Sequence, residues 1–173
     1  MSKQILNFIF LYIILLLAQV LICNNVCLFN IATPFVFLFF IIRLPIHISA
    51  NWMMTICFFA GLLIDIFSDT QGMNALACLV MGASRGKILD LYVPRRDEIT
   101  NPVPSMKSLG IGVYLKYMLT MVLLFCLIIT FVEAFTLKNF WLSMLRALGS
   151  TLFTFVLLLG IDSLVNTKNE KRL

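Results

Sequence analysis

The most informative of the charged residues that lie inside or at the edges of long apolar stretches of this sequence are Asp65, Asp69, Glu133 and Arg146. Charged groups are costly in an apolar environment and usually pair with one another there. The chemistry open to them is therefore ion pairing, and we predict a pair between Asp65 and Arg146, with Glu133 as the competing partner. A proton relay from Asp65 to Arg146 is less favoured, because no carboxylates continue it further along the apolar stretches.

A stripe of polar residues surrounds Arg146, and their spacing places them on one face of a helix. Its members are Asn139, Ser143, Arg146, Ser150 and Thr154. One interpretation is a polar cleft or a seam on which a partner helix docks. The other is that the Ser and Thr hydroxyls bond their own backbone carbonyls while the small neighbouring residues pack.

The sequence contains no motif typical of catalysis or of cofactor binding. Lys87 is followed by Ile88, so the Gly82–Lys87 stretch lacks the ending of a phosphate-binding loop. The single His accompanies no Cys at metal-ligand spacing. Cys23 and Cys27 could form a local bridge in an oxidising compartment, and the sequence leaves their state open. We expect no enzyme activity, no cofactor and no metal.

The composition explains why so few residues could do chemistry. The 173 residues are 61% hydrophobic and 12% charged, with a mean hydropathy of +1.02. Residues 4–42 contain no charged residue and no His, and this run is long enough for two membrane-spanning helices of about 20 residues each. These values exclude a soluble enzyme, a disordered chain and a nucleic-acid-binding domain. They predict a polytopic membrane protein.

The order of apolar and polar stretches predicts an all-α bundle of six transmembrane helices in a single domain. The first apolar run lacks a cleavage site, so we expect it to be a retained helix rather than a signal peptide. A hydrophilic loop follows the fourth span at 94–107, and a charged tail occupies 166–173. The expected spans are 5–22, 33–47, 52–67, 71–92, 109–135 and 139–165.

The distribution of basic residues predicts the orientation in the membrane. Six spans place both termini on one side, and that side then receives ten of the thirteen Lys and Arg residues. By the positive-inside rule, both termini are expected in the cytoplasm. Arg95 and Arg96 lie in the cytoplasmic loop, where they are either solvated or contact anionic lipid or a cytoplasmic protein.

Three stretches together resemble the rod shape-determining protein MreD family, in a form like that of Bacteroidetes bacteria. The most characteristic stretch is residues 61–75, GLLIDIFSDTQGMNA, in which Gly61, Asp65, Asp69, Gly72 and Ala75 occupy the family motif. The second is Val93-Pro94-Arg95, and the third is Glu133-Ala134-Phe135 followed by Asn139-Phe140-Trp141. The resemblance covers nearly the whole chain in length and in span order.

This resemblance implies a non-enzymatic membrane scaffold of the cell-wall elongation machinery in the bacterial cytoplasmic membrane. It implies MreC as a direct partner, with MreB, RodA and the transpeptidase partner of RodA in the same assembly. It also implies a fold similar to the substrate-binding subunits of energy-coupling-factor transporters. A substrate-capture subunit of a small-molecule transporter is therefore the alternative, while the charged cluster of Asp65, Asp69, Glu133 and Arg146, together with the polar stripe, is the expected docking surface for MreC.

Overall fold

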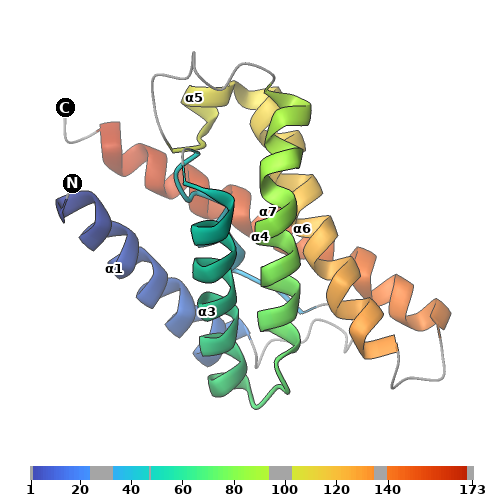
Figure 1. Ribbon diagram of the computed structural model, residues 1–173. Helices are drawn as coiled ribbons and strands as arrows, with labels where there is room; N and C mark the ends of the chain where they lie inside the picture. The colour runs from blue at the N-terminus through green and yellow to red at the C-terminus, as the bar shows by residue number, and fades with distance from the viewer. Residues whose placement is uncertain (1, 24–32, 47, 94–102, 135–139, 171–173) are drawn as a thin grey trace.

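The computed structural model describes residues 2–23, 33–46, 48–93, 103–134 and 140–170, and every regular element in these ranges is helical (Figure 1). A π-helical turn, Gln19–Cys23, extends the first helix. The α-helices are α1 (Ser2–Ala18), α2 (Leu38–Ile42), α3 (Ala50–Ser68), α4 (Met73–Tyr92), α5 (Met106–Leu109), α6 (Ile111–Ala134) and α7 (Phe140–Glu170).

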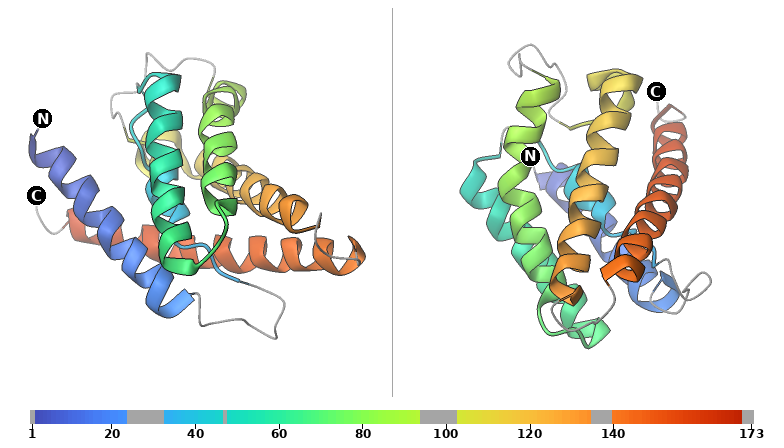
Figure 2. Two further views of the ribbon diagram at one scale, coloured as in Figure 1. Left: turned by 60° about the horizontal axis from the view of Figure 1, so that its bottom comes forward. Right: turned by 90° about the vertical axis from the view of Figure 1, so that its right-hand side faces the viewer.

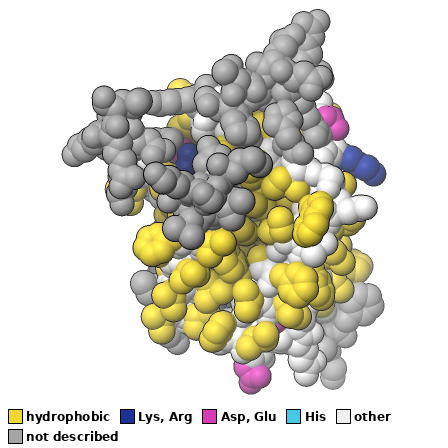
Figure 3. Space-filling view, turned by 60° about the vertical axis from the view of Figure 1, so that its left-hand side comes forward, with side chains coloured by type: hydrophobic (Ala, Val, Ile, Leu, Met, Phe, Trp, Pro, Cys, Tyr) yellow, Lys and Arg dark blue, Asp and Glu magenta, His cyan; other side chains and the backbone are white. Residues whose placement is uncertain are grey.

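Three helical stretches within the described ranges are long and apolar enough to cross a membrane: Ala50–Ser68, Ile111–Val132 and Met144–Val165. A shorter apolar stretch, Phe8–Leu21, lies in the first helix. Large hydrophobic side chains are exposed on these helices, and they cover much of one face of the molecule (Figure 3). The chain is therefore a multi-pass, all-α membrane protein, as the composition predicts.

The helices α3 and α4 form a closely packed hairpin. A Cβ atom on Gly61 would lie 2.6 Å from both Ala75 Cα and Asn74 O, so only glycine permits this approach of the two backbones. Near the other end of the hairpin, a Cβ on Gly82 would lie 3.0 Å from Cys57 Sγ. In Figures 1 and 2, α6 lies beside α4, and α7 crosses on the far side of α6.

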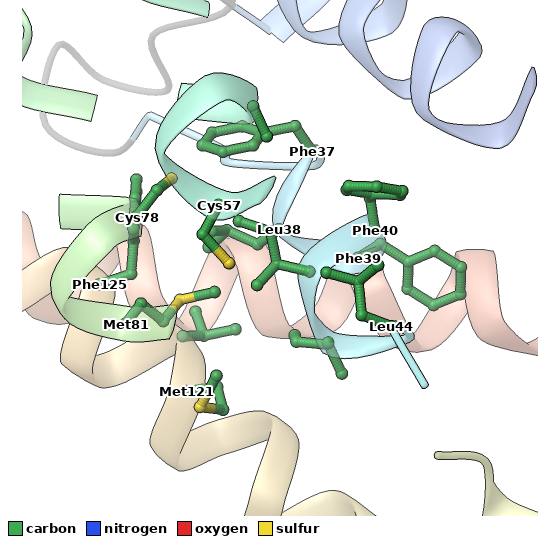
Figure 4. Packing of buried hydrophobic residues seen from close by; sticks show 14 of the residues in the cluster. Phe37, Leu38, Phe39, Phe40, Leu44, Cys57, Cys78, Met81, Met121 and Phe125 are labelled. Carbon is green, nitrogen blue, oxygen red and sulfur yellow. The ribbon is translucent and has the colours of Figure 1, made fainter. Parts of the chain in front are cut away.

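The second predicted span, 33–47, differs from the prediction. Among the described residues of this range only Leu38–Ile42 is α-helical, while residues 33–35 have no regular secondary structure and residues 36–37 form a turn. Side chains from Val36 to Ile42 are buried, so this segment faces protein on all sides rather than lipid. Figure 4 shows its side chains packed among residues of α3, α4 and α6, including Cys57, Met81 and Met121. Pro34 and Pro45 restrict the helix at its two ends, which an apolar run alone does not reveal.

Candidate functional site

The carboxylate of Asp65, on α3, binds the first turn of α4. Its oxygens accept hydrogen bonds from the backbone N–H of Asn74 (3.1 Å) and of Ala75 (2.7 Å). The side-chain amide of Asn74 donates to the same carboxylate at 2.9 Å, and the hydroxyl of Thr70 also donates to it. The first N–H groups of a helix lack partners within the helix and carry partial positive charge. Asp65, which is 4% exposed, therefore caps α4 from the neighbouring helix.

The structure gives Asp65 different partners from the one predicted. Arg146 forms no ion pair within the described ranges, and its Nε atom is buried without a hydrogen-bond partner there. Asp65 is instead occupied by α4, because the αL residue Asp69 (φ 53°) turns the chain back so that α4 begins beside α3. Asp69 itself is exposed, and the side chain of Glu133 lies outside the described residues.

The motif residues of 61–75 thus form one structural unit. Gly61 admits the backbone of Ala75, and Asp65 caps the helix in which Ala75 lies. Asp69 ends α3 in the left-handed conformation, and Gly72 precedes α4 at φ +79°, where glycine is favoured. The spacing of the five motif residues in the sequence is therefore the spacing that a tight helical hairpin with a buried carboxylate requires.

The non-helical start of the 33–46 segment is held by side chains of two other helices. Ser150 and Thr154 of α7 accept hydrogen bonds from the backbone N–H of Thr33 and of Phe35, both at 3.1 Å. Backbone groups that are not in a helix need such partners at membrane depth. The polar stripe on α7 therefore binds this chain's own backbone at two of its members.

Gln19 completes this arrangement from the π-helical turn. Its Nε2 donates to Pro34 O at 3.0 Å, and its Oε1 accepts from the N–H of Val36 at 2.8 Å. Of the remaining stripe members, Arg146 is half-buried, while the side chains of Asn139 and Ser143 lie outside the described residues. Neither interpretation of the stripe anticipated bonds to a segment more than 100 residues away in sequence.

A cavity of about 240 Å³ opens where these two networks meet. Its polar lining comes from Gln19, Thr33, Ser68, Thr70 and Asn74, and its apolar lining comes from Phe35, Ile64, Met73 and Ile129. The sequence alone did not indicate this cavity, since its walls come from five separate segments.

A second polar cluster lies toward the other end of the 33–46 segment. Arg43 Nη2 and Asp162 Oδ1 are 3.0 Å apart, and Tyr114 donates its hydroxyl to the same carboxylate oxygen at 3.1 Å. Asp162 is fully buried, so it is not the interfacial carboxylate that its place near the end of α7 suggests. An available signal was the isolation of Arg43 between an apolar run and Pro45, which is typical of a buried, paired charge.

Arg85 of α4 is 2% exposed and binds the end of the same segment. Its Nη atoms donate to the carbonyls of Leu44 and Pro45, the latter at 3.4 Å, and its Nε donates to Tyr117 Oη at 2.9 Å. The positive-inside count assigned Arg43 and Arg85 to the cytoplasmic side. In the structure both are part of the interior of the bundle.

None of the remaining candidate residues has a side chain that the structure describes. Arg95, Arg96 and Cys27 lie outside the described residues, as does the side chain of Cys23. No group of His, Cys, Asp and Glu that could hold a metal is found in the part of the chain that the structure describes. Comparison of the chain with protein-family models, with curated proteins and with solved structures finds no match.

Proposed function

We propose that this chain is a non-enzymatic membrane scaffold of the bacterial cell-wall elongation machinery, similar to MreD. In this proposal it docks the single membrane-spanning helix of MreC. Through MreC it holds MreB, RodA and the transpeptidase partner of RodA in one assembly. The observation that carries the proposal is the 61–75 hairpin, in which all five residues of the motif have a definite structural role.

In the proposed topology the chain crosses the membrane six times, with both termini in the cytoplasm. The crossings are α1 with its π-helical turn, the buried 33–46 segment, α3, α4, α6 and α7. An even number of crossings agrees with the positions of the chain ends, since α1 begins and α7 ends toward the end of the molecule where α4 finishes (Figure 1). The excess of Lys and Arg on that side supports the cytoplasmic assignment.

Among the stripe residues whose side chains the structure describes, Arg146 is the most exposed and therefore the most available to a partner. Ser150 and Thr154 are buried and already bind the 33–46 segment, whereas the Arg146 side chain is partly exposed and forms no ion pair with the described residues. An Arg in this state provides donors for a carboxylate or for backbone carbonyls of MreC. Asp65 is less suitable, because its lone pairs are used by α4.

Co-purification with MreC tests this docking surface. We expect Arg146→Ala to lower the yield of the complex, while Lys116→Ala, an exposed basic residue on α6, leaves it unchanged. Both variants should elute as monodisperse protein before the comparison is made. An undiminished complex with Arg146→Ala would remove this face of α7 from the interface.

Depletion in the host tests the function itself. Loss of rod shape, with dispersed insertion of new wall, is the expected result, and it should be reversed by wild-type protein. Normal shape together with a specific nutrient requirement would contradict the scaffold. That result would favour a substrate-capture subunit, the second candidate function, which the 240 Å³ cavity also supports. A neighbouring gene for an ATPase would point the same way.

A further inference from the structure

The cavity lies at a point where a crossing segment is not helical. Thr33 and Phe35, which line it, belong to the non-helical start of the 33–46 segment. Non-helical backbone at membrane depth is tolerated where it is buried in protein or borders a cavity. In transporters, broken crossing segments of this kind form the substrate and ion sites. The position of the cavity is therefore typical of a binding site rather than of a packing defect.

The hydrogen bonds around the cavity determine which polar groups remain for a ligand. Both ends of the Gln19 amide are used by the backbone of Pro34 and Val36. The amide of Asn74 is fixed in orientation, because its nitrogen donates to the carboxylate of Asp65, which accepts only. This leaves Asn74 Oδ1, which is buried and has no partner among the described residues.

Thr33 supplies the second available group. Its backbone N–H binds Ser150, but its hydroxyl makes no hydrogen bond to the residues that the structure describes. The side chain is half-buried and lines the cavity. A hydroxyl can both donate and accept, so Thr33 suits a ligand with an alcohol or an amide group.

The described lining of the cavity offers no free counter-charge for an ionic ligand. The lining contains no charged side chain in the described ranges, and the nearby carboxylate of Asp65 is compensated by the first turn of α4. An ion would enter an apolar site without a counter-charge, which is strongly unfavourable. The apolar side chains of Phe35, Ile64 and Ile129 instead match an uncharged body.

The volume sets the size of the ligand. An engineered apolar cavity of about 150 Å³ holds a benzene molecule. A volume of about 240 Å³ therefore leaves room for one ring with a small polar group. We propose that this cavity is a binding site for a small uncharged molecule, whose alcohol or amide group bonds Thr33 beside Asn74 and whose apolar body contacts Phe35, Ile64 and Ile129. This binding site does not depend on the scaffold proposal, which is tested separately by cell shape and by MreC binding.

The experiment measures binding of four similar probes to the full chain in lipid nanodiscs by ligand-observed nuclear magnetic resonance. Benzamide and benzyl alcohol are uncharged, whereas benzoate and benzylammonium carry a charge on a similar frame. We expect saturable binding of at least one uncharged probe with a millimolar or lower Kd. The charged probes should bind at least about tenfold more weakly, because the cavity offers no counter-charge. Empty nanodiscs measure partition into lipid.

Two variants with matched controls locate the binding in the cavity. Ile129→Phe fills the cavity and should abolish saturable binding, whereas Leu127→Phe, on the exposed side of the same helix, should preserve it. Thr33→Val removes only the hydroxyl and keeps the volume, so it should weaken binding about fivefold, as for a lost neutral hydrogen bond. Thr55→Val, at an exposed threonine of α3, should leave the Kd unchanged.

Three results would overturn the proposal. The first is no saturable binding of either uncharged probe at millimolar concentration. The second is equal binding of charged and uncharged probes. The third is equal binding to Thr33→Val and Thr55→Val, which share one chemical change, although only Thr33 lines the cavity. Circular dichroism of the variants separates a lost site from a lost fold.

Discussion

Arg43 and Asp162 form an ion pair of 3.0 Å in the interior of the bundle, between the end of the short helix α2 and the last helix, α7. Tyr114 of α6 donates to the same carboxylate. Three segments that are distant in sequence therefore meet at one buried charge pair. This pair fixes one end of the 33–46 segment, while Gln19, Ser150 and Thr154 fix the other.

Removing one member of this pair should destabilise the fold strongly. Arg43→Met leaves the fully buried Asp162 carboxylate without the cation that compensates its charge, and such losses amount to about 3–5 kcal/mol. We expect the double variant Arg43→Met/Asp162→Leu to recover much of the loss, because neither charge remains. Free energies of unfolding in mixed micelles check this, with the exposed Lys116→Met as the control. Additive losses in the double variant would contradict the pairing.

Removing the carboxylate of Asp65 should loosen the α3–α4 hairpin. Asp65→Ala leaves the buried N–H groups of Asn74 and Ala75 unpaired, at about 1–3 kcal/mol for each unsatisfied group. Asp65→Asn keeps one acceptor and should lose less. Asp69→Asn is the matched control, because Asp69 is exposed and Asn tolerates the left-handed conformation. Hydrogen exchange at the N–H groups of residues 74 and 75 reports the effect directly.

Gly61→Ala should separate the two helices of the hairpin. Its Cβ would lie 2.6 Å from the backbone of α4, which must move, and overpacking of this kind destabilises by about 1–3 kcal/mol. Gly160→Ala on α7 is the control, since its Cβ would meet no atom within 4 Å, and alanine favours the helix. The two thermal unfolding midpoints should shift in opposite directions. Equal shifts would show that the close approach at Gly61 is unimportant.

Two buried threonines of α7 should respond differently to the same substitution. Thr154→Val leaves the backbone N–H of Phe35 unpaired and should lose about 1–3 kcal/mol. Thr151→Val should lose less, because no backbone N–H among the described residues depends on the Thr151 hydroxyl, which donates to Ala147 O one turn earlier in its own helix and shares a side-chain hydrogen bond with Cys126. Thermal unfolding in detergent micelles compares them. A similar loss for both would mean that the contact between α7 and the 33–46 segment contributes little.

The membrane environment and most helix bounds follow from local sequence. Apolar runs of 19, 22 and 22 residues in α3, α6 and α7 are long enough to cross a bilayer, and this property requires no knowledge of neighbours. The turn of the α3–α4 hairpin is also local, since Asp69 and Gly72 adopt the positive φ angles that close it. The bounds predicted for 52–67 and 71–92 therefore agree closely with those of the helices α3 and α4, and α3 is also among the candidate membrane spans, whereas α4 is not.

The partners of the polar residues depend on the tertiary structure. Asp65 was expected to pair with the opposite charge of Arg146. The turn that follows α3 instead places the first N–H groups of α4 beside the Asp65 carboxylate, which accepts their hydrogen bonds. Arg43 meets Asp162 across more than 100 residues of sequence, because only the folded bundle brings α2 against α7. The 33–46 segment is apolar enough to resemble a lipid-facing span, yet it lies inside. An apolar side chain is equally stable against lipid and against protein, so hydropathy alone cannot separate these two positions, and the hydrogen bonds supplied by Gln19, Arg85, Ser150 and Thr154 decide between them.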